Sequence, residues 1–272
     1  MSDALQLFAT EVQRADAELD LGRAALLIAK DAYPNLDMEM PLTLLDELGA
    51  GLRAQIADSR DEQQIAYAIR RRLFHDLEFR VNEGDFYDPR NSFLNDVLIR
   101  RRGIPISLSV VFIEVARRVG LVAEGVSFPQ RFLVKYRAGG QEWIVDPTLF
   151  GEEFSGEHFR AHLATSSAAP AHLVDYHLAA ATKRQVLTRM LANLKAIYTE
   201  REDDARLLRI QEFRLAITPW AFDEIRDRGI LRARTGDFPG ALSDLDIYLA
   251  NAGPAEDLPR VRDLVERLRG RG

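Results

Sequence analysis

The segment from Pro105 to Val119 constrains the fold more than any other part of the sequence. Drawn as a helix, it carries apolar side chains around most of its circumference, and such a helix is stable only when it is buried on all sides. Pro105 suits the first helical position, where its missing N–H removes no hydrogen bond, and Gly120 is placed to end the helix. The segment therefore predicts a central helix around which a domain packs.

The hydrophobic period changes from helical spacing to alternation directly after this helix. The alternating segments predict strands at residues 122–128, 131–137 and 142–146. The sequence Ala138-Gly139-Gly140 predicts a tight turn between the last two strands, and so an antiparallel hairpin. Helical patterns precede them at residues 4–17, 21–32, 41–58 and from 61 onward. Helices followed by a small antiparallel sheet predict an α+β fold with a helical N-terminal lead-in.

The sequence predicts where a short helix before the central helix begins and ends. Asn91 or Ser92 is expected to cap a short helix, since either side chain can accept a first-turn backbone N–H. Gly103 is expected to end that helix in the left-handed conformation that glycine adopts readily.

Residues 183–272 predict an all-α tail that follows a boundary near Thr165–Pro170. Two domains are therefore expected, at residues 1–165 and 183–272. Small and apolar residues in the tail fall at the spacing of a tetratricopeptide repeat, a pair of closely packed antiparallel helices; they are Ile225, Gly229, Gly236, Phe238, Ala241, Leu245 and the pair Gly253-Pro254. Such a tail offers a groove to a peptide or a partner protein, or it forms a structural cap.

Composition narrows the classes of function. The 272 residues are 47% apolar, with a formal net charge of −6. Binding to nucleic acid calls for a basic face, which this composition does not indicate, so we expect no nucleic-acid partner. No apolar stretch is long enough to span a bilayer, and the N-terminus has no signal-peptide pattern, so we expect a cytoplasmic protein without a membrane partner. The chain has no cysteine, which removes disulfides, thiolate metal sites and a thiol nucleophile.

No cofactor or metal ion is expected from the motifs. The sequence has neither of the glycine-rich loops that cradle nucleotide phosphates. His158 and His162 have the i, i+4 spacing of a helical zinc site, but the third ligand and the intervening glutamate of the metalloprotease motif are missing.

Four short stretches in the same order resemble the SirB-type family, in which a transglutaminase-like, papain-like core is followed by tetratricopeptide repeats. They are Tyr87–Asn95, Arg101–Ser109, Val126–Pro129 and Val145–Pro147. The resemblance extends over most of the chain, from about Leu21 to Arg269. It implies the same two-part architecture here, and its repeats imply a protein or peptide partner.

The wider transglutaminase-like superfamily implies a mechanism that this chain departs from. In it a cysteine at a helix N-terminus attacks a carbonyl, a histidine shuttles the proton and an aspartate orients the histidine. The cysteine position falls on Pro105 and the histidine position on Arg131, where relatives carry Gly-His in place of Gln130-Arg131; Asp146 is retained. No catalytic residue is therefore expected, and we predict a cross-strand ion pair between Arg131 and Asp146 that fixes the register of the hairpin.

Three functions follow as alternatives. The favoured one is a non-catalytic protein that binds a protein or peptide, with Asp88, Arg90, Asn91, Asn95 and Arg131 as binding residues. The second is a residual amidohydrolase or protease-like enzyme with Ser107 as nucleophile, although two residues along a helix turn a side chain by about 200°. The third is a regulator of gene expression acting through protein contacts.

Overall fold

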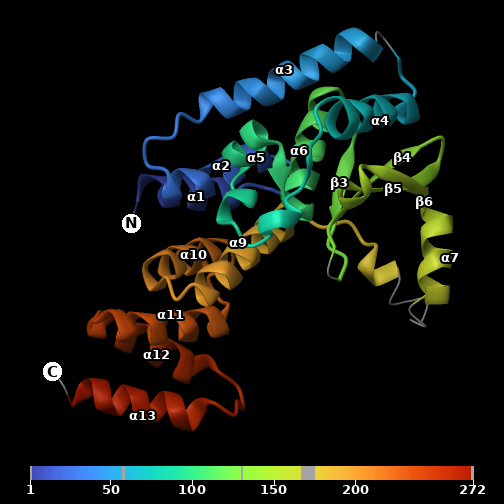
Figure 1. Cartoon of the computed structure of the whole chain (residues 1–272). Helices are drawn as coiled ribbons and strands as arrows, with labels where there is room; N and C mark the ends of the chain where they lie inside the picture. The colour runs from blue at the N-terminus through green and yellow to red at the C-terminus, as the bar shows by residue number, and fades with distance from the viewer. Residues whose placement is uncertain (1, 57–58, 130, 167–174, 271–272) are drawn as a thin grey trace. The chain divides into compact units, whose positions relative to one another are not determined.

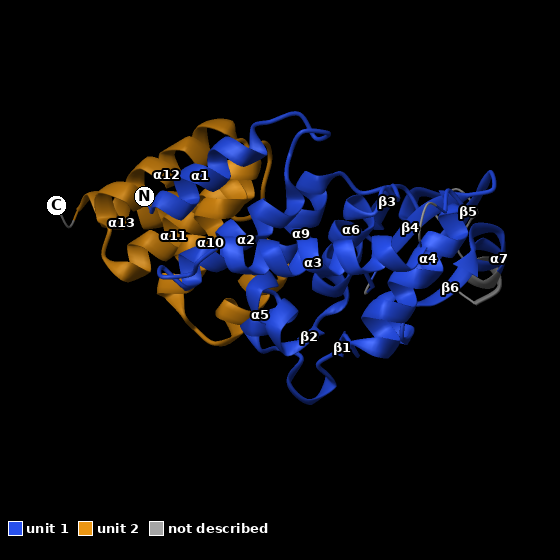
Figure 2. Cartoon of the chain, turned by 90° about the horizontal axis from the view of Figure 1, so that it is seen from above, with its two compact units in different colours: residues 1–190 blue, residues 191–272 orange. Residues whose placement is uncertain are grey.

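A computed structural model of the chain describes residues 2–56, 59–129, 131–166 and 175–270. They form two compact units, residues 1–190 and residues 191–272, shown in different colours in Figure 2. The division between the units along the chain falls within helix α9 (Lys183–Glu200). The expected boundary at Thr165–Pro170 falls mostly on residues 167–174, which lie outside the described residues.

The first unit contains most of the predicted helices. Ser2, Asp20 and Asp61 act as N-caps of the first, second and fourth helices, each accepting a hydrogen bond from a first-turn backbone N–H. After the fourth helix the backbone continues as a π-helical turn, η1 (Arg71–Asp76). The helices are α1 (Asp3–Val12), α2 (Leu21–Ala32), α3 (Glu39–Ile56), α4 (Glu62–Arg70), α5 (Leu94–Arg100), α6 (Pro105–Arg118) and α7 (Gly156–Ser166).

Helix α6 is the centre of the first unit, as the sequence predicts. Every residue from Ile106 to Ala116 is buried, and α6 contacts α2, α3, α4 and α5 as well as the sheet strands β3 and β4 (Figure 1). An all-round apolar surface is satisfied only by such enclosure.

One buried carboxylate ties α6 to its neighbours. Glu114 Oε1 accepts a hydrogen bond of 3.2 Å from the backbone N of Gly22, in the first turn of α2, and Oε2 lies 2.7 Å from Arg118 Nη1. Arg118 Nε in turn lies 2.7 Å from Asp46 Oδ1 on α3. The position of α6 along its own axis is therefore linked to two other helices by charge-assisted hydrogen bonds.

The antiparallel sheet has the strand order β3-β4-β5-β6, formed by β3 (Ala123–Val126), β4 (Leu133–Ala138), β5 (Gln141–Asp146) and β6 (Glu152–Ser155). The predicted hairpin is confirmed, because β4 and β5 pair antiparallel and Gly139 and Gly140 both have positive φ. The sequence patterns missed β6. They also missed a short parallel pair, β1 (Arg80–Val81) with β2 (Arg102–Gly103).

Both predicted ends of α5 are wrong. Phe93 is the N-cap residue, while Asn91 ends the short 3-10 turn η3 (Pro89–Asn91). The left-handed C-cap is Arg101, with φ of 54°. Gly103 instead lies in β2, where an added Cβ would be 2.6 Å from Ser107 Oγ, so close approach and not helix termination requires glycine there.

The second unit is all-helical, and its helices are α10 (Asp204–Ile217), α11 (Phe222–Thr235), α12 (Phe238–Asn251) and α13 (Leu258–Arg269). Two glycines of the predicted repeat, Gly229 and Gly236, have the structural roles expected of a pair of closely packed antiparallel helices. A Cβ on Gly229 would lie 2.8 Å from Leu245, so the glycine lets α11 and α12 approach closely, and Gly236 ends α11 with φ of 87°. None of the helices in the described part of the chain combines the length and apolar character that a membrane crossing requires.

Candidate functional site

The start of α6 carries the position that the resemblance assigns to the nucleophile. Pro105 is the first helical residue, and Ser107 is the third. Ser107 Oγ accepts a hydrogen bond of 3.0 Å from the backbone N of Ile104 and lies 2.6 Å from the carbonyl oxygen of Asn91, to which it donates. The hydroxyl is fully buried. Its geometry is that of a helix cap, with its proton bound to a main-chain carbonyl and not to a base.

The predicted ion pair between Arg131 and Asp146 is present. Arg131 Nη1 donates to Asp146 Oδ2 at 3.0 Å, and the carboxylate is completely buried while the arginine side chain is 51% exposed. Asp146 ends β5, but Arg131 precedes β4 in the loop from β3, so the prediction of a strand beginning at Arg131 is wrong and the pair joins a loop to a strand end.

The second oxygen of Asp146 is also occupied. Oδ1 accepts hydrogen bonds from the backbone N of Thr148 at 2.8 Å and from Thr148 Oγ1 at 2.6 Å. Asp146 thus caps the turn η4 (Pro147–Leu149) in the manner of a helix N-cap. Both oxygens of Asp146 therefore have hydrogen-bond partners, one in the loop before β4 and the other in the turn η4.

The three segments that carry these positions meet in the fold. Helix α6 contacts β4 and η4, and Ser109 Oγ donates to the carbonyl oxygen of Phe132 at 3.3 Å. Figure 1 shows α6 beside β3 and β4. The long sequence separation between residues 105, 131 and 146 is therefore closed by packing around one helix.

The polar cluster of residues 88–95 makes mainly local contacts. Asp88 is buried, and its carboxylate lies 2.8 Å from Arg90 Nε and 3.4 Å from Arg100 Nη2. Burial raises the pKa of Asp88, but the hydrogen bonds from Arg90 and the charges of Arg90 and Arg100 outweigh it, so the pKa is lowered from its ordinary value. Asn91 Nδ2 donates to the carbonyl oxygen of Asp85 at 2.7 Å.

The same cluster supports the start of α6. The carbonyl of Asn91 accepts the Ser107 hydroxyl, and Asn91 Oδ1 accepts from Asn82 Nδ2 at 3.1 Å. Asn95 Oδ1 is buried and finds no hydrogen-bond partner within the described chain. Arg90 is the member with a largely exposed side chain, so it is the one able to reach a partner while the others hold the loop.

The sequence patterns missed two sets of exposed aromatic residues, one in contact with β1 and the other following β1 in the sequence. The guanidinium of Arg80 lies 4.6 Å from the ring centre of Phe150, which is 56% exposed. Phe86 and Tyr87 follow β1 in the sequence, are also exposed, and meet edge to face at 5.6 Å. The signal available in the sequence is an aromatic residue directly after the Asp146–Leu149 turn and another pair directly before Asp88.

The histidines do not form a cluster in the described part of the chain. No group of three or more histidine, aspartate, glutamate or cysteine side chains there is arranged to hold a metal ion. His158 stacks on Phe154; the side chain of His162, like the whole of His172, lies outside the described residues. His177 is half-buried and packs edge-on against Phe128.

Comparison with known proteins agrees with this architecture. Residues 41–192 match the family model of the transglutaminase-like superfamily, and residues 194–266 match a tetratricopeptide repeat. The chain is thus a transglutaminase-like protein with a tetratricopeptide tail, which confirms the fold and the resemblance predicted from the sequence. No solved structure gives a significant match.

The relatives define the family more closely. A UPF0162 protein of Xylella fastidiosa strain Temecula1 is 37% identical over 238 residues, covering 86% of this chain and 84% of the relative. A UPF0162 protein of Vibrio cholerae is 28% identical and covers 88% and 90%. This chain belongs to the UPF0162 family. It is also 30% identical to human F-box only protein 21 over 153 residues, which are 54% of this chain and 24% of that protein.

Proposed function

We propose that this protein is a non-catalytic transglutaminase-like protein that binds a protein or peptide, with a regulatory or scaffolding role in the cytoplasm. The observation that supports it most directly is the full occupation of Asp146. One oxygen accepts from Arg131 and the other from Thr148. A carboxylate bonded in this way orients no imidazole, and the chain supplies no thiol for one to activate.

The surface around this ion pair suits a peptide that carries a carboxylate and apolar side chains. Arg131 uses one N–H on Asp146, and its exposed guanidinium makes no other hydrogen bond to any described residue. A guanidinium held by a buried carboxylate is pre-oriented to donate to a partner's carboxylate. Phe150 is exposed and follows the turn that Asp146 caps, so it supplies apolar contact beside the pair, and Arg90 is a further exposed cation on the loop before α5.

The second unit offers a separate surface for a partner. Tetratricopeptide repeats generally mediate protein contacts, and a cavity of about 200 Å³ on this unit is lined by apolar and basic side chains. Its lining residues are Ile230, Ala233, Arg234, Phe238, Leu264, Arg267 and Leu268. An acidic segment with apolar residues fits this surface as well.

A peptide display experiment tests the proposal. We expect the full chain to enrich acidic peptides with apolar residues, and the Arg131→Ala variant to lose a distinct subset of them. Arg137→Ala is the matched control, because Arg137 is an exposed arginine on β4. Failure to enrich any peptide, or enrichment that Arg131→Ala leaves unchanged, contradicts a binding role for Arg131.

A parallel assay tests the enzyme alternative. The hydrogen bond from Ser107 to the Asn91 carbonyl counts against a nucleophilic serine, so we expect no labelling by a serine-directed covalent probe and no turnover of glutamine or peptide substrates. Labelling that Ser107→Ala abolishes would overturn the non-catalytic proposal. A gene-regulatory role stays a prediction, which the identity of any captured partner would test.

A further inference from the structure

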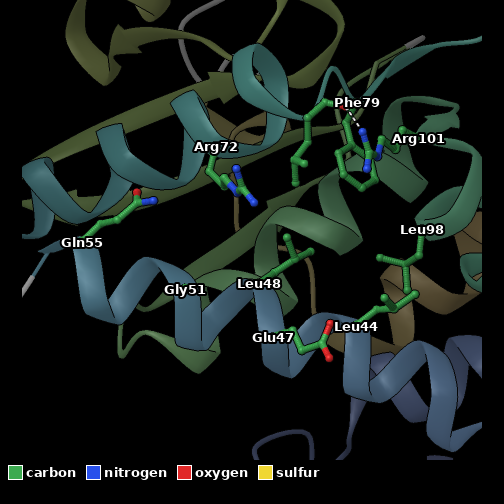
Figure 3. A pocket seen from close by; sticks show the side chains of 10 residues that line it. Leu44, Glu47, Leu48, Gly51, Gln55, Arg72, Phe79, Leu98 and Arg101 are labelled. Atoms are coloured by element: carbon green, nitrogen blue, oxygen red, sulfur yellow. Dashed lines mark hydrogen bonds between the residues drawn. The ribbon is translucent and has the colours of Figure 1, made fainter.

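A second cavity lies in the first unit, and its lining includes no residue of the segments that carry Arg131 and Asp146. It has a volume of about 290 Å³ and is formed by α3, by residues 72–79 at and after η1, and by α5 (Figure 3). Its walls are apolar and its rim is polar; the walls are Leu44, Leu48, Leu77, Phe79 and Leu98, and the rim is Glu47, Gln55, Arg72 and Arg101. Small-molecule sites span roughly 300–1,000 Å³, so this one suits a small ligand.

A glycine in the wall has no structural explanation within the protein. Gly49 and Gly51 both lie in the interior of α3, where a glycine makes a helix less stable than an alanine does. Gly49 is explained, because a Cβ there would lie 2.6 Å from Arg118 Cβ. A Cβ on Gly51 would meet nothing within 4 Å, and Gly51 lines the cavity. Its missing side chain leaves space in the cavity and serves no helix packing.

Of the two arginines on the rim, only Arg72 has a carboxylate of a described residue within ion-pair distance. Arg101 donates one long hydrogen bond of 3.4 Å to the carbonyl oxygen of Leu77, drawn dashed in Figure 3, and forms no ion pair with a described residue. Arg72 lies 4.0 Å from Asp76, at the limit of an ion pair. Glu47 stands at the opposite edge, beside Leu44 in Figure 3. The cavity is therefore cationic at one end and anionic at the other, with an apolar floor between.

Unusual backbone surrounds the cationic end. Arg72 belongs to the π-helical turn η1, and π-turns occur frequently at functional sites. Glu78 and Arg101 both have positive φ, of 57° and 54°, although neither is glycine. Non-glycine residues in this conformation cost free energy and cluster at ligand sites.

From these features we propose that this cavity binds a small monocarboxylic acid with a compact apolar group. The carboxylate accepts hydrogen bonds from Arg72 and Arg101, whose guanidiniums match its geometry, and the apolar group lies against Leu48 and Leu98 in the space beside Gly51. Glu47 at the far edge repels a second carboxylate and so disfavours dicarboxylic acids. The residues that line this site are different from those proposed for the partner surface.

Titration of the full chain with phenylacetate, monitored by calorimetry and by NMR chemical shifts, tests the proposal. Phenylacetamide has the same shape without the charge, and phenylmalonate adds a second carboxylate. We expect millimolar or tighter binding of phenylacetate and at least about tenfold weaker binding of the other two, since a hydrogen-bonded charge contributes that much to affinity. Equal binding of acid and amide, or no detectable binding of phenylacetate, overturns the proposal.

Two variants locate the site. Gly51→Leu fills the cavity without a clash at Cβ, so it should abolish binding while the thermal midpoint stays the same or rises. Arg101→Asn removes the guanidinium but retains a residue that tolerates positive φ, and should weaken binding about tenfold. The control is Arg53→Ala, an exposed arginine on α3 outside the lining. Unchanged affinity in Gly51→Leu overturns the assignment to this cavity.

Discussion

Arg131 and Asp146 differ in exposure, and that difference decides what each contributes. The carboxylate is completely buried with both oxygens bonded, whereas half of the arginine side chain faces solvent. Removing the arginine leaves a buried charge with hydrogen bonds from Thr148 only, and a buried charge that loses its partner is destabilising. The exposed partner moderates the effect, because solvent screens its charge.

Arg131→Ala is therefore expected to lower the free energy of unfolding by about 1–2 kcal/mol. Urea denaturation of the variant and the wild type measures the difference. Arg137→Ala, on the exposed side of β4, should stay within about 0.5 kcal/mol of the wild type. Equal effects of the two substitutions would show that the ion pair contributes nothing specific to stability.

Arg131→His is expected to restore no hydrolytic activity. The substitution supplies an imidazole next to Asp146, but the start of α6 still offers a proline and a serine whose proton is bound to a carbonyl. The assay is turnover of glutamine and peptide substrates by the purified variant. Measurable turnover that Ser107→Ala removes would show that a nucleophile survives at this helix.

At the level of single residues the sequence predicts pairings better than conformations. The Arg131–Asp146 contact followed from the two positions that the family resemblance assigns to the histidine and the aspartate, which carry opposite charges in this chain. The C-cap at Arg101 did not, because glycine is the usual left-handed residue and Gly103 stands two positions later. Glycine is required at position 103 because Ser107 Oγ approaches it closely. This contact depends on three-dimensional packing that no local sequence pattern contains.

The helix pair α11 and α12 shows how one small residue controls an element. Gly229→Ala would place a Cβ 2.8 Å from Leu245 Cγ and 3.0 Å from Asp244 Cβ. We expect a loss of about 1–3 kcal/mol, the usual cost of overpacking. Gly51→Ala is the opposite case, because its Cβ meets nothing, and should raise stability by about 0.5–1 kcal/mol. Thermal and urea unfolding of both variants checks the two signs, and a common sign would contradict the packing argument.

The contact between α9 and α11 gives a pH-dependent prediction. Burial raises the pKa of Asp227, but hydrogen bonds from Lys195 and Arg226 lower it by more, so its folded-state pKa lies below 3.8. The unfolded chain then takes up the proton first as the pH falls, so the stabilisation is complete at neutral pH and is lost below about pH 4.

The Asp227→Asn variant measures this contribution. Its free energy of unfolding should fall short of the wild-type value most clearly near neutral pH, and the gap should narrow as the pH drops below about 4. Urea denaturation at a series of pH values follows the gap. A gap that widens with acidification would reverse the sign and contradict the lowered pKa.

Elements with a strong period were predictable, and short or irregular ones were not. Helix α2 was predicted with the bounds that the structure has. Strand β6 has four residues and is half-exposed, so its alternation is too brief to detect. The π-turn η1 continues the apolar spacing of α4 and is distinguished only by its backbone hydrogen bonds. The cavity that η1 helps to form is lined by three segments that are far apart in the sequence, so it was not predicted.

Across the whole molecule, helix α9 belongs to both compact units, and its first turns complete the first one. Lys183 Nζ donates to the carbonyl oxygen of Leu19 at 2.7 Å, and Arg184 Nε to that of Val12 at 2.8 Å. A Cβ on Gly125 in β3 would lie 3.2 Å from Val186, which is buried. The compact unit therefore continues beyond the expected domain end at residue 165.

Truncation tests this continuity. A fragment of residues 1–200 should unfold cooperatively, whereas a fragment of residues 1–182 should be markedly less stable, since it uncovers the apolar surface that α9 buries. Circular dichroism during thermal unfolding compares the two. Equal midpoints would show that α9 adds nothing to the first unit. The two-part organisation was predictable from repeat spacing, but the sharing of one helix was not, because periodicity does not report which neighbour a helix packs on.

The buried Glu114 has a consequence for how much change the start of α6 tolerates in this protein. A helix held only by apolar packing can slip by a fraction of a turn when its contacts change. Here any slip would pull a charged oxygen away from the Gly22 amide and Arg118. The first turn of α6 is therefore held in place from farther along the same helix, so a substitution at that turn can change its chemistry without moving the scaffold that surrounds it.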